Sequence, residues 1–170
     1  TNAVDILIKV LEDVKQEPMV RHEAAEALGA IGSIESTKIL EKFSKDDIQE
    51  VKETCELALD RIKWLHSEEN KKLSENPYNS VDPAPPCKTT DIIQLKSTLL
   101  NENASLFDRY RAMFSLRNIR SKESILALCE ALKHGSALFR HEIAFVLGQL
   151  QSDVSVPALT ESLMDSSENE

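Results

Sequence analysis

The sequence predicts an all-α fold: a solenoid of helical hairpin repeats in two halves, joined by a proline-rich linker. Apolar residues recur at intervals of three and four along most of the chain, as in helices that bury one face. An eleven-residue stretch beginning at Met19 also returns in nearly the same form at Leu138, and such self-similarity indicates a repeat architecture. The composition agrees, because 170 residues with 4 glycines, 5% aromatic and 41% hydrophobic side chains suit helices better than a sandwich or barrel.

The repeated stretch has the form Arg-His-Glu, followed by apolar residues at helical spacing and a final Leu-Gly. It occurs as Arg21–Gly29 and as Arg140–Gly148. Two weaker copies, Arg109–Leu116 and Lys52–Leu59, share the apolar frame but lack the His-Glu pair. Neighbouring copies start 31 residues apart in each half, which is within the range of helical solenoid repeats. We therefore expect hairpins of an outer and an inner helix, with His-Glu in the first turn of two inner helices.

The first half, residues 1–65, is predicted to contain two such hairpins. Pro18 suits the first turn of a helix, Gly32 follows the end of that helix, and Ser36 is expected to cap a short one. A longer helix opens at Asp46 and buries a stripe of apolar residues that ends at Trp64. The predicted helices run, in order, over Val4–Glu12, Pro18–Ile31, Ser36–Phe43 and Asp46–Trp64.

A linker over residues 66–90 separates the halves, and residues 91–170 resume the pattern. The linker holds four of the six prolines, among Ser, Asn and charged residues, which is typical of an extended connection. The helices predicted after it run over Asp91–Leu100, around Arg109, over Lys122–Leu132, around Arg140 and over Val156–Leu163. The last hairpin has an outer helix without an inner one, so the sequence predicts a central fragment of a longer protein.

The net charge and the cysteine content indicate which classes of partner and which cellular compartment to expect. A net charge of -9 disfavours nucleic acid and anionic membranes and favours a cationic partner. No stretch approaches the roughly 20 apolar residues of a membrane helix, and no signal peptide is visible. The three widely spaced cysteines, without a Cys-x-x-Cys pair, are expected to be reduced thiols. These observations predict a cytoplasmic protein without nucleic-acid or membrane partners.

The two His-Glu pairs, His22-Glu23 and His141-Glu142, are the candidate metal ligands. Adjacent helical residues point about 100° apart, so one pair alone is poorly arranged to hold an ion. Pairs from two successive inner helices could supply two imidazoles and a carboxylate, a donor set that suits non-haem iron(II). The alternative is a solvated first turn, in which the glutamate interacts with the helix dipole. His66 and His134 are expected at the surface rather than in a metal site.

Four segments of the chain resemble deoxyhypusine hydroxylases, and the similarity extends through the linker. They are Gln16–Gly32, Tyr78–Pro86, Leu106–Phe114 and Ser136–Glu142. The resemblance implies a superhelix of HEAT-type hairpins in two halves that holds two Fe(2+) ions and activates dioxygen. Such an enzyme is a monooxygenase that hydroxylates the deoxyhypusine side chain, a cationic modified lysine of a translation factor, and so completes hypusine.

The resemblance also implies roles for individual residues. His22 and Glu23 would bind the iron of the first half, and His141 that of the second. Glu142 would be a metal ligand or a catalytic carboxylate that holds the substrate amine. Met19 and Phe139, which precede the motifs, are expected to shape the substrate channel, with ordinary packing as the alternative.

This chain carries only two of the four His-Glu motifs that the resemblance implies, the second and the third. The isolated chain is therefore expected to bind iron weakly or not at all and to lack hydroxylase activity. Two other readings remain open. One is a non-catalytic repeat scaffold that binds a protein on its concave face, and the other is a metal-free repeat enzyme that resembles bilin lyases.

Overall fold

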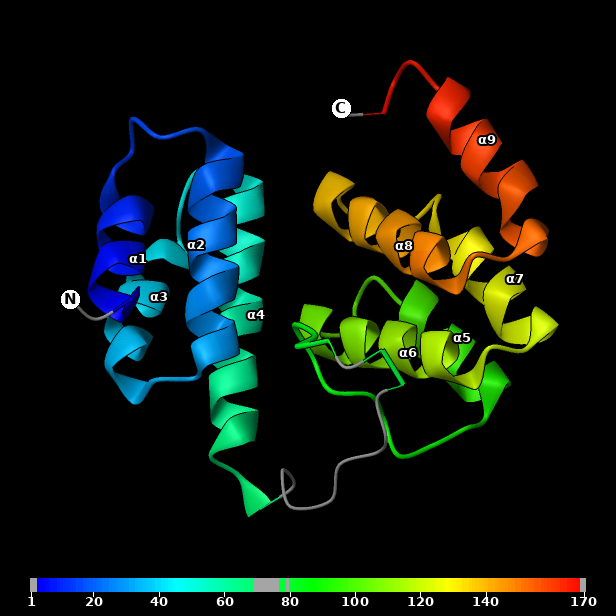
Figure 1. Cartoon of the computed structure of the whole chain (residues 1–170), viewed down its shortest axis with the longest axis horizontal. Coiled ribbons are helices and arrows are strands. Elements are labelled where there is room, and N and C mark those ends of the chain that lie inside the picture. Colours follow the sequence, from blue (N-terminus) through cyan, green and yellow to red (C-terminus); the bar gives the residue numbers. More distant parts are fainter. Residues whose placement is uncertain (1–2, 69–76, 79, 169–170) are drawn as a thin grey trace. The chain divides into compact units, whose positions relative to one another are not determined.

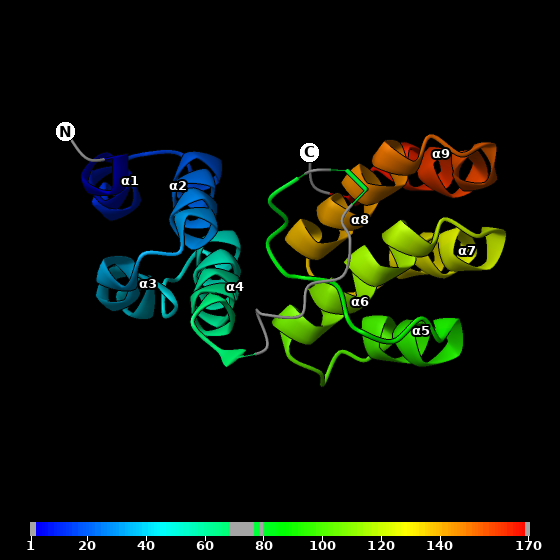
Figure 2. The same cartoon turned by 60° about the horizontal axis from the view of Figure 1, so that its bottom comes forward.

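The computed structural model describes residues 3–68, 77–78 and 80–168, and every regular element within these ranges is helical. The all-α prediction is therefore confirmed. The chain divides into two compact units, Thr1–Leu73 with Asn79–Pro85 and Ser74–Tyr78 with Pro86–Glu170. In each unit the helices form two layers, which are visible in Figure 1 and more clearly after rotation in Figure 2.

The first unit pairs outer helices α1 and α3 with inner helices α2 and α4 (Figure 2). Their bounds are α1 Ala3–Glu12, α2 Pro18–Ile31, α3 Thr37–Phe43 and α4 Gln49–Leu65, with a 3-10 turn at Ile34–Ser36. Pro18 begins α2, and Gly32 closes it with a φ of 73°, a backbone conformation that favours glycine. The core of the unit is formed by Val4, Leu11, Ala24, Ala25, Leu28, Leu40, Phe43, Val51, Cys55, Ala58, Leu59 and Ile62.

The two inner helices of this unit approach each other closely at Gly29. A Cβ atom added at this position would lie 2.8 Å from the Cβ and 2.9 Å from the Cα of Ala58 on α4. Glycine is therefore the residue that allows α2 and α4 to pack at this distance. The matching Gly148 in the second repeated stretch has more room, because, apart from the backbone of its own helix and its chain neighbours, no described atom lies within 4 Å of the place where its Cβ would be.

One predicted helix cap is wrong. Ser36 precedes α3, but its side chain makes no capping hydrogen bond, and its buried hydroxyl oxygen has no hydrogen-bond partner among the described residues. Ser33 has the capping role instead, because its hydroxyl accepts a hydrogen bond from the N–H of Glu35 and starts the 3-10 turn. The turn inserted before α3 moves the cap three residues upstream.

In the second unit, α6 and α8 lie along one side and α5, α7 and α9 along the other (Figure 2). Their bounds are α5 Ile92–Leu100, α6 Leu106–Ile119, α7 Lys122–Ala131, α8 Ala137–Leu150 and α9 Val156–Met164. Side chains cap four of these helices at their first turns, as expected for Ser and Asp at such positions. The caps are Asp91 for α5, Ser105 for α6, Ser121 for α7 and Ser136 for α8.

The described linker residues make defined contacts with the helices. Ala84 is fully buried, and the backbone carbonyl of Asp82 accepts a hydrogen bond from the Arg61 guanidinium on α4. Further along, the N–H of Cys87 donates to the hydroxyl of Ser115 on α6 at 2.7 Å. None of the helices in the described ranges is long and apolar enough to cross a membrane.

Candidate functional site

His22 lies near the start of α2 and is buried, with 6% of its surface exposed. Its Nδ1 atom lies 2.6 Å from the hydroxyl oxygen of Thr54, which comes from the neighbouring inner helix α4. The same hydroxyl lies 2.7 Å from the backbone carbonyl of Glu50, one helical turn earlier, and donates to it. The packing of α4 against α2 therefore holds the His22 ring in one orientation.

Two carboxylates approach the other ring nitrogen of His22. The Nε2 atom is 3.9 Å from Oε1 of Glu23 and 3.8 Å from Oε2 of Glu26. Glu23, a predicted ligand, is exposed, whereas Glu26 is half-buried. Burial and the charge of Glu23 raise the pKa of Glu26, and the positive charge of Arg61 partly offsets this effect. One imidazole nitrogen and two carboxylates thus face each other on a single helix.

Glu26 is a site residue that the sequence reasoning missed. Its signal was present, because it stands four residues after His22 and three after Glu23, so its side chain lies one helical turn from each of them. The corresponding position in the second repeated stretch is Phe145, which is 55% exposed. The two stretches therefore differ at this position of the site.

The residue before the histidine of each His-Glu pair is an arginine whose hydrogen bonds hold the start of the inner helix. Arg21 is 3% exposed; its Nε–H donates to the carbonyl of Leu11 on α1 at 3.0 Å. Its Nη2 lies 2.5 Å from Oδ2 of Asp46, shortly before α4. Arg109 on α6 repeats the first of these contacts, with its Nε–H donating to the carbonyl of Leu99 on α5 at 3.0 Å. The arginine thus belongs to the repeat itself, and the histidine is added to it.

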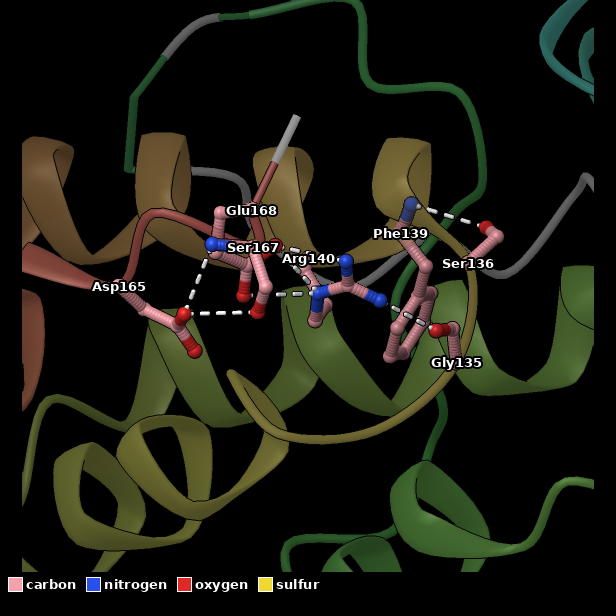
Figure 3. Close-up of polar contacts among 7 residues, drawn as sticks. All are labelled: Gly135, Ser136, Phe139, Arg140, Asp165, Ser167 and Glu168. Atoms are coloured by element: carbon pink, nitrogen blue, oxygen red, sulfur yellow. Dashed lines mark hydrogen bonds and ion pairs between the residues drawn. The ribbon is translucent and has the colours of Figure 1, made fainter. Parts of the chain in front are cut away.

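Arg140 makes a related but more exposed set of contacts in the second unit (Figure 3). Its Nε and Nη2 donate to the carboxylate of Glu168 at distances of 2.6–3.1 Å, and its Nη1 donates to the carbonyl of Gly135 at 2.7 Å. Ser136 completes the turn, because its hydroxyl accepts a hydrogen bond from the N–H of Phe139. These contacts hold the start of α8, where His141 lies.

His141 and Glu142 differ from their counterparts in the first unit. His141 is exposed and Glu142 is half-buried, whereas His22 is buried and Glu23 exposed. His22 is covered by α4, the next inner helix, but no inner helix follows α8 among the described residues. The described ranges contain no group of three His, Cys, Asp or Glu side chains arranged to hold a metal ion.

His66, His134 and Phe139, which were also singled out in the sequence, make contacts elsewhere in the two units. The Nε2 atom of His66 lies 3.1 Å from the carbonyl of Gly32, and Nδ1 of His134 lies 3.8 Å from the carboxylate of Glu102, so these contacts do not involve the His-Glu pairs. Phe139 is fully buried beneath the guanidinium of Arg109, 3.9 Å from its ring centroid. The expectation that Phe139 shapes a substrate channel is therefore wrong for this residue, which packs in the core.

Met19, the other residue expected to shape a channel, is 46% exposed at the start of α2. The cysteines are free thiols, and they are suited to packing rather than to nucleophilic chemistry. Burial raises the pKa of the Cys55 thiol to about 12, and burial also raises the pKa of Cys87 and Cys129. These thiols stay protonated near neutral pH, so none of them provides an activated nucleophile.

The chain belongs to the HEAT-repeat family, whose profile matches residues 1–60 and 95–170. The resemblance to deoxyhypusine hydroxylases is also confirmed. The chain is 59% identical over 169 residues to deoxyhypusine hydroxylase of Drosophila melanogaster. These residues make up 99% of this chain and 56% of that protein. It is 52% identical over 167 residues to deoxyhypusine hydroxylase of Homo sapiens, covering 98% of this chain and 55% of that protein.

A solved structure agrees with these relatives. The structure of human deoxyhypusine hydroxylase in complex with glycerol matches with a TM-score of 0.92 and 52% sequence identity. The match covers 98% of this chain and 57% of that chain. The chain thus spans a little more than half the length of the relatives that it matches.

Proposed function

We propose that this chain is part of a deoxyhypusine hydroxylase, a monooxygenase that uses two Fe(2+) ions and dioxygen to hydroxylate deoxyhypusine. The observation that carries the proposal is the 59% identity to a hydroxylase over nearly the whole chain. The substrate would be a cationic modified lysine on a translation factor, which fits a chain with a net charge of -9. A translation factor as substrate places the enzyme in the cytoplasm.

The side chains near His22 in the first unit offer the types of donor atom that iron binds, but too few of those described are arranged around one point to hold an ion. The Nε2 atom of His22 and the carboxylates of Glu23 and Glu26 are nitrogen and oxygen donors of the kind that iron(II) accepts. However, no three acidic, histidine or cysteine side chains in the described ranges are arranged to enclose an ion. We infer that His22 and Glu23 hold one iron together with donors that other repeats of a longer protein supply.

The second unit would hold the other iron in the same way, through His141, with Glu142 as a further ligand or as the catalytic carboxylate. A carboxylate beside the iron would attract the substrate amine by charge and orient the side chain for reaction. Bound ferrous iron would supply the activation of dioxygen.

The first test uses the isolated chain. We expect anaerobic titration with Fe(2+) to show less than one tightly bound ion per chain, and we expect no hydroxylation of a deoxyhypusine-bearing substrate, because each iron lacks ligands. Iron content by elemental analysis and product by mass spectrometry measure the two outcomes. Stoichiometric iron with turnover would contradict the inference that each site needs further repeats.

The second test uses the full-length protein and separates an enzyme from a scaffold, the alternative that the incomplete metal site leaves open. We expect His22→Ala or His141→Ala to remove one iron each and to abolish hydroxylation, because imidazole ligands are lost. His66→Ala, at a histidine away from the His-Glu pairs, is the control and should retain both irons and activity. A non-catalytic scaffold would contain no iron in the wild type and would keep its protein partner in all three variants.

A further inference from the structure

The hydroxyl of Thr54 has a single proton, and two short contacts determine where that proton lies. Its oxygen is 2.6 Å from Nδ1 of His22 and 2.7 Å from the carbonyl oxygen of Glu50. A carbonyl oxygen can only accept, so the contact with Glu50 is a hydrogen bond only if Thr54 donates to it. The contact with Nδ1 must then be a hydrogen bond in which the ring nitrogen donates and the hydroxyl oxygen accepts.

The opposite arrangement is unfavourable. If Thr54 donated its proton to Nδ1, lone pairs of the hydroxyl and of the Glu50 carbonyl would face each other at 2.7 Å. The side chains of Thr54 and His22 are withdrawn from water, since Thr54 is 3% and His22 6% exposed. In such surroundings a lost hydrogen bond is not replaced by one to solvent. The arrangement that satisfies both contacts keeps a proton on Nδ1.

We propose that Thr54 is a positioning residue that keeps a proton on Nδ1 of His22, so that Nε2, the nitrogen nearest to Glu23 and Glu26, is the one left to bind a metal ion. In a neutral imidazole only one nitrogen carries a proton, so a protonated Nδ1 leaves Nε2 as the electron-pair donor. A hydrogen bond at one ring nitrogen commonly selects the other as the metal-binding atom. The role of Thr54 in metal binding rests on the proposed function, whereas the position of the proton on Nδ1 does not.

The position of Thr54 in the repeat explains why a neighbouring helix has this role. Counted from Lys52, Thr54 occupies in α4 the position that Glu23 occupies in α2 when counted from Arg21. The repeat that lacks the His-Glu pair therefore still contributes a polar side chain to the site, at the position of the missing glutamate. One inner helix supplies the imidazole, and the next supplies the acceptor that orients it.

Two-bond proton–nitrogen correlation spectra of the chain, with ¹⁵N-labelled histidine, test the proposal at a pH where the ring is neutral. The wild type should show a protonated Nδ1 and an unprotonated Nε2 for His22, assigned by comparison with His22→Gln. Thr54→Val, which removes the hydroxyl at nearly constant volume, should lose this pattern and move the Nδ1 resonance toward the unprotonated position. Thr54→Ser, which keeps the hydroxyl, should restore the wild-type pattern. A thermal melt checks the fold of each variant.

An unprotonated Nδ1 in the wild type would overturn the proposal, even if Thr54→Val failed to fold. An unchanged pattern in a folded Thr54→Val would overturn it as well. In the full-length protein, Fe(2+) affinity should fall by about 10–100-fold in Thr54→Val and recover in Thr54→Ser. If the wild-type full-length protein bound no iron, the proposed function would fail while the proton position would remain as the spectra give it.

Discussion

Replacing Arg21 by Met is expected to reduce the free energy of unfolding of the first unit by about 3–5 kcal/mol. The guanidinium is almost completely buried, joins the carbonyl of Leu11 to the carboxylate of Asp46, and lies 5.1 Å from the ring centroid of Phe43. The variant keeps an apolar stem but leaves the charge of Asp46, whose side chain is 11% exposed, without its partner. Urea denaturation followed by fluorescence of Trp64, the only tryptophan and a residue of α4, measures the loss.

Arg140→Met is the matched control in the second unit. Its pair with Glu168 is more exposed, with 23% and 27% of the two side chains accessible. Exposed pairs contribute up to about 1 kcal/mol, so the far-UV circular dichroism of this variant should show a correspondingly small loss of stability. Equal losses for the two variants would contradict the difference in burial between the two arginines.

The ion pair between Arg21 and Asp46 also leads to a prediction about the stability of the first unit at acidic pH. Burial opposes the charge of Asp46, but the hydrogen bonds from Arg21 and from the N–H of Ile48, with the attraction of Arg21, outweigh burial and lower the pKa of Asp46. A lowered carboxyl pKa gives stability that is fully present above the unfolded value of 3.8 and is lost as the pH falls through the lower folded value. Arg21→Met should weaken this loss below pH 3.8, and an unchanged acid transition would count against the assignment.

Gly29→Ala is expected to cost about 1–3 kcal/mol, because the added methyl group would force α2 and α4 apart. A Cβ atom at this position would lie 2.9 Å from the Cα of Ala58, and a backbone atom cannot move aside as a flexible side chain can. The same displacement would draw His22 away from Thr54, so the Nδ1 contact of 2.6 Å should also lengthen. Trp64 fluorescence in urea measures the stability, and the histidine spectra measure the contact.

Gly148→Ala is the control for this second prediction, since the two glycines occupy matching positions of the repeated stretch. Apart from the backbone of α8 and the two chain neighbours, no described atom lies within 4 Å of the added atom, so the substitution should be neutral or stabilise α8 by about 0.5–1 kcal/mol through helix propensity. Similar losses at both positions would show that the close approach of α2 and α4 is not what requires glycine at Gly29.

Much of the fold was predictable from the sequence, because helix position depends on local features. The α2 helix illustrates this: apolar spacing, Pro18 at its start and Gly32 at its end defined it from nearby residues alone. The cap at Ser36 was predicted wrongly because a 3-10 turn and an α-helix begin with similar residues, and only the backbone path distinguishes Ser33 from Ser36.

The candidate site was less predictable. His22 and His141 occupy the same position of nearly identical stretches, yet one is buried and the other exposed. The difference arises from the neighbouring helix, because α4 covers His22 and no inner helix follows α8 in the described ranges. For Thr54 the sequence offered only its position in the repeat frame, since its contact with His22 depends on the packing of α4, a helix of the next hairpin, against α2.

The sequence by itself determined the helices, the repeat frame, the His-Glu positions and the likeness to deoxyhypusine hydroxylases, because these depend on residues close together in the chain or on matching strings. Only the tertiary structure decided that Thr54 approaches His22, that Arg21 joins α1 to the start of α4, and that Phe139 packs in the core. These contacts depend on which helix faces lie against each other. That arrangement follows from the packing of whole hairpins rather than from the order of residues within one helix.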